Sequence, residues 1–130
     1  MEFTFYDYLD EAGTNVIREW RDALPVAVKA KFTNALLHLE GARPGDWKRP
    51  LVDTLTEGEC QGLFEVRRKL SRIQYRLLGC HGPGQRQPTL LHGFIKPGNR
   101  VPEAECREAH RRRNAVEADP QKRRTLHDYG

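Results

Sequence analysis

The segment GLFEVRRKLSRIQYRLLGCHGPGQRQPTLLHGFIK, residues 62–96, decides the fold. It opens with an alternation that puts Phe64 and Val66 on one side and Glu65 and Arg67 on the other, the period of two typical of a β-strand. This alternation recurs twice, and glycine and proline residues before the third occurrence indicate a long loop. We therefore predict an antiparallel meander of three strands, over residues 63–68, 73–78 and 90–96.

One face of this predicted sheet gathers positive charge. Arg67 and Arg76 fall on the polar side of neighbouring strands, and His92 and Lys96 fall on the corresponding side of the third. Like charges on one face repel, so a fold tolerates them mainly where a polyanion or an acidic partner binds. Two interpretations are open at this point, a binding surface or an ordinary solvated basic face.

Two helices are expected before the sheet. Apolar residues at three- and four-residue spacing predict a first helix after Thr14, and a second helix is expected from Pro25 to Gly41. The apolar stripes of such a hairpin need a sheet to cover them, so we predict an α+β fold with the helical hairpin packed on the meander. Trp47, in the following loop, is either a plug over the edge of the core, which is the interpretation we favour, or a platform on which a base stacks.

The C-terminal quarter is polar. A helix is predicted from about Pro102, with a thin apolar edge at Ala104, Ala109 and Val116, and we expect it to lie exposed or loosely docked. Pro120 interrupts it. The expected organisation is one domain over residues 1–118, followed by a mobile, polar and basic tail over residues 119–130.

Composition excludes several classes of protein. The 130 residues are 31% charged with a net charge of +4, and no stretch approaches the ~18 apolar residues of a membrane span. The acidic N-terminus lacks the pattern of a secretory signal, so a cytoplasmic location is expected. Three cysteines without Cys-x-x-Cys spacing are interpreted as reduced thiols. Cys80 and His81 are only a weak metal pair, so we expect no metal or other cofactor. Basic triplets in the later chain favour nucleic acid as the partner.

Four short motifs in this order resemble the RelE/ParE toxin superfamily, in particular its HigB-like, phage-associated branch of type II toxin-antitoxin toxins. They are GLFEVR at residues 62–67, YRLL at residues 75–78, LHGFIK at residues 91–96, and the helix from Pro102 to Arg113. The resemblance covers roughly residues 14–118. It implies a small α+β fold and a toxin that cuts messenger RNA on the translating ribosome without a metal. It also implies an antitoxin partner of the helix-turn-helix type.

Carried over residue by residue, the resemblance matches Arg67 and Arg76 to the arginines of the strand motifs, and His92 and Lys96 to the polar positions of the last strand. Arginine grips phosphate oxygens and stays charged, so we expect Arg67 and Arg76 to stabilise the transition state. His92 is the candidate for proton transfer, or else a structural residue, and Glu65 is either an alternative base or an ion-pair partner. The residues expected to bind RNA are Arg68, Lys69, Lys96, Arg112 and Tyr129, the last of these either stacking on a base or lying in a disordered end.

One departure concerns Lys96-Pro97, where many relatives carry two consecutive lysines. One basic contact near the end of the strand is therefore absent. The superfamily also includes inhibitors of DNA gyrase and members without known activity, and a fold does not settle a function. The alternatives to an endoribonuclease are thus a non-catalytic gyrase inhibitor and a catalytically inactive module that binds nucleic acid or the ribosome.

Overall fold

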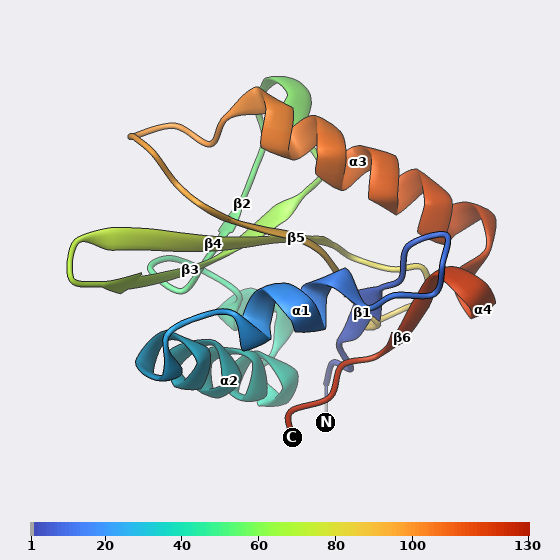
Figure 1. The fold of residues 1–130 in the computed structure, drawn as a ribbon, viewed down its shortest axis with the longest axis horizontal. Helices are drawn as coiled ribbons and strands as arrows, with labels where there is room; N and C mark the ends of the chain where they lie inside the picture. The colour runs from blue at the N-terminus through green and yellow to red at the C-terminus, as the bar shows by residue number, and fades with distance from the viewer. Residues whose placement is uncertain (1) are drawn as a thin grey trace.

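The computed structural model describes residues 2–130, and these form the predicted α+β fold (Figure 1). The strands in this part of the chain are β1 (Tyr6–Tyr8), β2 (Val52–Thr54), β3 (Phe64–Leu70), β4 (Ile73–Cys80), β5 (Thr89–Ile95) and β6 (Arg124–Leu126). The α-helices are α1 (Val16–Asp22), α2 (Val26–Gly41), α3 (Glu103–Ala118) and the single-turn α4 (Pro120–Arg123), and the 3-10 helices are η1 (Pro44–Asp46) and η2 (Gly58–Cys60).

The strands form one sheet in the order β2-β3-β4-β5-β1-β6, with the predicted meander at its centre. Its neighbours run antiparallel except β1 and β5, which pair in parallel. Leu70 pairs with Ile73, so β3 and β4 are joined by the two residues Ser71 and Arg72, whose φ angles are 52° and 68°. Positive φ at both positions matches the twist of the flanking strands. This turn fixes the register in which Arg67 lies opposite Arg76.

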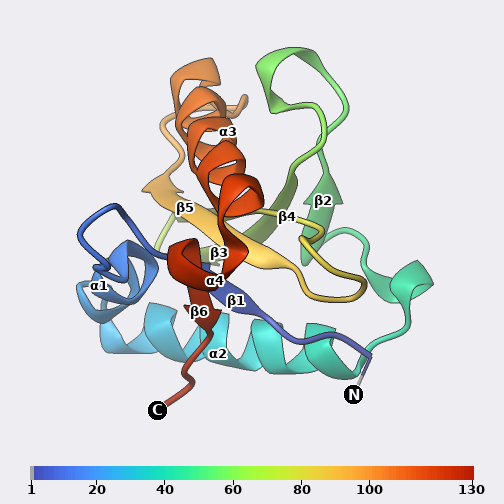
Figure 2. The ribbon, with the colours of Figure 1, turned by 90° about the vertical axis from the view of Figure 1, so that its right-hand side faces the viewer.

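Helices cover both faces of the sheet. The predicted hairpin of α1 and α2 packs on one face, and α3 packs on the other (Figure 2). Gly93 shows how closely α1 approaches, because a Cβ atom there would lie 2.2 Å from the ring of Trp20. Trp47 contacts the rings of Phe3, Phe5 and Phe64 and donates a hydrogen bond to the carbonyl of Leu39 at 3.1 Å, which confirms it as a plug over the core. No helix among the described residues is long and apolar enough to cross a membrane.

The expectation of a loosely docked C-terminal helix was wrong. Cys106, Ala109 and Val116 of α3 are fully buried against the sheet, whereas Ala104 faces solvent. A narrow apolar edge suffices because a disulfide between Cys60 and Cys106 ties the helix to η2. The interpretation of all three cysteines as reduced thiols is therefore corrected for this pair, and Cys80 is the free cysteine.

The expectation of a mobile C-terminal tail was also wrong. After α4 the chain forms β6, which pairs antiparallel with β1 at the edge of the sheet. The ring of His127 then contacts the buried carboxylate of Asp7, with 2.7 Å between Nδ1 and Oδ1. Backbone pairing and this buried contact order the segment, although its sequence has few apolar residues.

Candidate nucleic-acid interface

The basic residues of the meander form a groove on the face that α3 partly covers. Because side chains alternate along a strand, Glu65, Arg67 and Lys69 of β3 share this face. Arg67 lies opposite Arg76, and Lys69 lies opposite Gln74. An open pocket of about 510 Å³ here is lined by Pro50, Leu51, Arg67, Arg68, Lys69, Gln74 and Arg76. We use the name basic groove for this pocket together with Lys96, whose charge interacts with those of Arg76 and Arg67.

Glu65 lies at the centre of the positive charge. Its Oε1 atom is 3.5 Å from Nε of Arg76 and 3.6 Å from Nε of Arg67, so one carboxylate offsets the repulsion between the two guanidinium groups. Burial raises the pKa of Glu65 above its ordinary value, and attraction to Arg76, Lys96 and Arg67 opposes this rise. The other carboxylate oxygen, Oε2, is buried without a hydrogen-bond partner in the described part of the chain.

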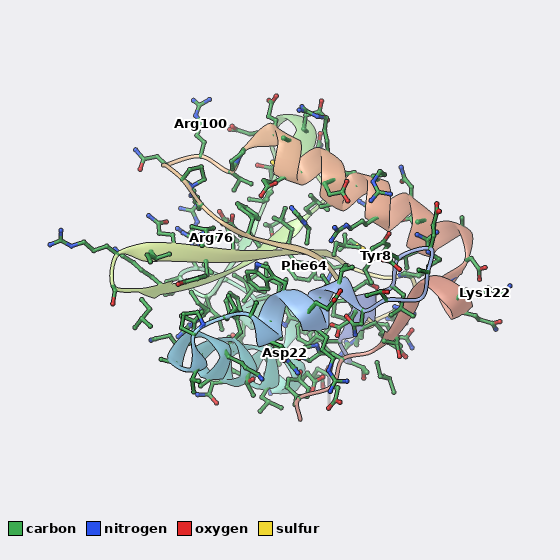
Figure 3. The ribbon with its side chains drawn as sticks, in the orientation of Figure 1. Tyr8, Asp22, Phe64, Arg76, Arg100 and Lys122 are labelled. Atoms are coloured by element: carbon green, nitrogen blue, oxygen red, sulfur yellow. A yellow bond between two sulfur atoms is a disulfide. The ribbon has the colours of Figure 1, made fainter. Side chains whose placement is uncertain are left out.

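Arg76 is a fixed member of the groove. Its side chain is 3% exposed, and it donates hydrogen bonds to the carbonyls of Tyr75 at 3.0 Å and Arg68 at 3.5 Å and to the amide oxygen of Gln74. Figure 3 shows Arg76 on the face of the sheet opposite to Phe64. Burial lowers the pKa of Arg76, an effect that Glu65 opposes, but a guanidinium stays charged under these conditions. Arg76 therefore contributes a charge held in one position.

Arg67 is the more solvent-exposed of the two arginines that contact Glu65. Its side chain is 28% exposed, and the 3.6 Å contact between its Nε and Glu65 is the one ion pair that the described residues give it. Its terminal N–H groups are therefore free to bind two oxygens of a phosphate in the planar geometry that arginine favours. Lys96 is half-buried beside it, and its pKa is lowered, mainly by burial and further by the charges of Arg76 and Arg67. Lys69 is exposed on the same face.

His92 lies on the same face but apart from the arginines. It pairs with Leu78 across β4, while Arg76 pairs with Phe94, so apolar side chains separate the imidazole from the groove. Its Nε2 is 3.2 Å from a carboxylate oxygen of Glu105 in α3, a contact within ion-pair range whose angle does not fit a hydrogen bond. The ring also stacks on Phe94, with 5.9 Å between centroids. These contacts favour the structural interpretation of His92.

Two residues expected to bind RNA lie elsewhere. Arg112 of α3 donates a hydrogen bond to the carbonyl of Leu91 at 2.8 Å, contacts Glu108, and lies over the ring of Tyr8. Tyr129 packs against His127, and burial raises the pKa of its phenol. Both side chains join parts of the fold to one another, and neither lines the basic groove.

Because side chains alternate along β3, Arg68 points to the opposite side of the strand from Arg67 and Lys69. Its position in the strand faces the other side of the sheet, in line with Tyr75, although the residue also lines the pocket. The sequence did not single out Gln74. The signal that could have identified it is its place two residues before Arg76, on the same side of the same strand.

Cys80 and His81, the weak metal pair considered from the sequence, lie in a largely apolar environment. Within residues 2–130 no group of three or more metal-binding side chains gathers. Cys80 is buried and its thiol contacts the carbonyl of Gly82, and burial raises its pKa to about 11. The ring of His81 packs against Trp47 and Phe64, and burial lowers its pKa. Both side chains therefore belong to the edge of the core.

Comparison with known proteins gives one family. A family model described as "Phage derived protein Gp49-like (DUF891)" matches residues 19–114, which span the chain from α1 into the last turns of α3. The match includes the whole meander and every residue of the basic groove. No curated protein and no solved structure matches the chain.

Proposed function

Because the chain belongs to the phage-derived Gp49-like family, a toxin-related family, we propose that it is the toxin of a type II toxin-antitoxin pair that cuts messenger RNA on the ribosome. The observation that carries this proposal is the convergence of Arg67 and Arg76 on Glu65 in an open basic groove. A buried carboxylate that holds two arginines in place costs stability through desolvation, which is unexpected for an ordinary solvated surface.

The groove suits cleavage that uses the substrate's own 2′-hydroxyl. The 2′-hydroxyl gives its proton to a base as its oxygen attacks the adjacent phosphorus, and the bond to the 5′-oxygen breaks. The 5′-oxygen takes a proton from the protonated base or from water, which leaves a 2′,3′-cyclic phosphate and a 5′-hydroxyl end. Negative charge grows on the phosphate oxygens during this step, and fixed donors that require no reorganisation stabilise it. Arg67 contacts the phosphate with its free N–H groups, and Arg76 and Lys96 supply fixed positive charge behind it.

Proton transfer has two candidates. Glu65 contacts both arginines, and burial raises its pKa above its ordinary value, which strengthens it as a proton acceptor. Histidine is a common proton-transfer residue, but the contact of His92 with Glu105 and its separation from Arg76 place it further from the phosphate-binding groups. We assign the base to Glu65, and His92 remains the alternative named by the sequence.

Membership of a toxin-related family supports an antitoxin partner in general. The ribosome and its message are the partners that the proposed reaction adds, and the antitoxin expected from the resemblance is of the helix-turn-helix type. The proposed location is the cytoplasm, where translation takes place.

Inhibition of DNA gyrase is the second candidate function. A gyrase inhibitor has no need for Arg67, Arg76 and His92 to converge, and His92 does lie apart from the two arginines. Arg67 and Arg76 nevertheless meet at one carboxylate, and for this reason we rank the nuclease first.

The proposal is tested with purified protein in a reconstituted translation system. A defined message is incubated with the protein alone, with the protein and programmed ribosomes, and with programmed ribosomes alone. We expect cleavage inside the reading frame only when protein and ribosomes are both present, with 5′-hydroxyl ends. An intact message, together with inhibition of supercoiling by purified gyrase, would replace the nuclease by the second candidate.

A further inference from the structure

The β3–β4 hairpin carries a second surface on the face opposite to the basic groove. Leu70 pairs with Ile73, and Tyr75 pairs with both Arg68 and Ile95, so these residues share one side of the sheet. Ile73 is 42% exposed and Ile95 is 56% exposed. We use the name hairpin face for the surface formed by Arg68, Leu70, Ile73 and Ile95.

The helical layer stops short of this surface. Figure 1 shows the turn of the hairpin at the end of the molecule, beyond the α1–α2 hairpin on the same side of the sheet. Single exposed apolar residues are common on protein surfaces. Ile73 and Ile95, however, are diagonal neighbours around Tyr75, close enough for their side chains to form one surface with the half-buried Leu70. A contiguous apolar surface at the end of a sheet is typical of an interaction site.

The charges carried by the β3–β4 hairpin itself from Val66 to Arg76 all have one sign. Residues 66–76 contain five cationic side chains and no acidic one. Arg68, Lys69 and Arg72 form no ion pair with any of the described residues, and Nε of Arg68 is buried without a hydrogen-bond partner. An occupant that buries the isoleucines would therefore meet Arg68 as an uncompensated charge, so it must bring carboxylates next to apolar side chains.

We propose that the hairpin face docks an acidic amphipathic segment of the protein that neutralises this chain, an inference that rests on the proposed toxin function. Aliphatic isoleucines offer no stacking surface to bases, whereas proteins that read single-stranded RNA use aromatic side chains for that purpose. The exposed isoleucines thus favour a protein over a nucleic acid. Because the groove and the hairpin face are two sides of one hairpin, a protein bound to the hairpin face blocks the approach of the ribosome to the groove.

The test is a binding measurement that does not depend on cleavage. The protein encoded by each of the two flanking genes is co-expressed with the Arg67→Ala chain, and the one that co-purifies is the probe. We expect Ile73→Asp combined with Ile95→Asp to weaken its binding at least about a hundredfold, because two apolar contacts are lost and two negative charges are added. Arg68→Ala is expected to weaken binding about tenfold and to reduce its dependence on salt.

The matched control is Leu126→Asp, which places the same charge on an equally exposed residue of β6, at the other end of the sheet from the hairpin, and should leave binding unchanged. A melting curve of each variant shows that it is folded. Unchanged binding by the folded double variant would overturn the inference. Failure of both neighbours to co-purify would also overturn it. A neighbour that co-purifies with the unmodified chain but not with the Arg67→Ala chain would place the inhibitor on the groove instead. None of these outcomes depends on whether messages are cut, so failure of the nuclease proposal is seen separately.

Discussion

Replacing Arg67 by alanine should remove cleavage and leave the fold intact. The side chain is 28% exposed, and the one ion pair it makes among the described residues is the 3.6 Å contact with Glu65. After its removal Glu65 keeps Arg76 at 3.5 Å, so no buried charge is left alone. We therefore expect a change of less than about 1 kcal/mol in the free energy of unfolding, as for a partly exposed ion pair.

The expected loss of activity is much larger. A fixed donor to the developing charge of a transition state is typically worth about 3–4 kcal/mol, which corresponds to a fall of about 10²- to 10³-fold in the cleavage rate. Arg67→Lys is the matched variant, because it keeps the charge but loses the planar pair of donors, and it should retain an intermediate rate.

Arg76→Ala provides the contrast. It removes a guanidinium that is 3% exposed and hydrogen-bonded to the carbonyl of Tyr75, and it leaves the buried Glu65 with the partly exposed Arg67 and the charge of Lys96. Breaking a buried pair costs about 3–5 kcal/mol, so this variant should lose both stability and activity.

The assay is single-turnover cleavage on programmed ribosomes, measured beside a denaturant unfolding curve for each variant. A folded Arg67→Ala protein that cuts at the rate of the unmodified chain would refute the assignment of the phosphate contact to Arg67. An Arg76→Ala protein as stable as the unmodified chain would refute the structural role given to Glu65 and Arg76.

Further outcomes follow from single features of the structure. Gly93→Ala should destabilise the fold by about 1–3 kcal/mol, seen as a lower melting temperature, because its Cβ atom would lie 2.2 Å from the ring of Trp20; an unchanged melting temperature would contradict this packing. His92→Gln should keep most of the single-turnover cleavage rate if the base is Glu65, and a fall of about 10²-fold or more in a stable variant would return the role to His92. The raised pKa of Glu65 means that the folded state binds its proton more tightly than the unfolded state, so this residue should lower stability as pH rises from about 4.5 through its folded pKa; unfolding curves for Glu65→Gln should lack that component. Thiol titration in denaturant should find one thiol, that of Cys80, before reduction and three after it, and three from the start would contradict the disulfide.

The sheet and the helical hairpin could be predicted because their patterns are local. Alternation along β3 and β4 determines which side chains share a face, and a two-residue turn with positive φ sets the register that brings Arg67 opposite Arg76. The side of the sheet on which each residue lies and the register between the two strands together determine where the basic groove forms. Both can be predicted from the sequence.

The burial of the groove's charges could not be predicted in this way. Whether Glu65 and Arg76 are exposed depends on segments that are far away in sequence, such as Leu51, which lines the same pocket as Arg76. The polar composition of α3 concealed its docking, because its contact depends on a few small residues and on one cysteine whose partner is 46 positions away. Cys106 does share a helix face with Ala109, and this spacing was the available signal.

The C-terminal strand was missed for a related reason. Three residues are too few to show an alternation, and β6 is ordered by its pairing with β1 and by the contact between His127 and Asp7. Partners of this kind lie at the opposite end of the chain and leave no periodic signal in the segment itself. His92 was misplaced for a similar reason, because its position relative to the arginines depends on the register between β4 and β5 across an eight-residue connection.

The most direct test of the account maps the ends of cellular messages after the protein is induced in a bacterium. The unmodified chain and the Arg67→Ala chain are induced to equal levels, and 5′-hydroxyl ends are sequenced during growth arrest. We expect new ends inside the reading frames of translated messages for the unmodified chain, and at least about a hundredfold fewer for the variant. Messages that stay intact while growth stops and plasmid supercoiling is lost would contradict it.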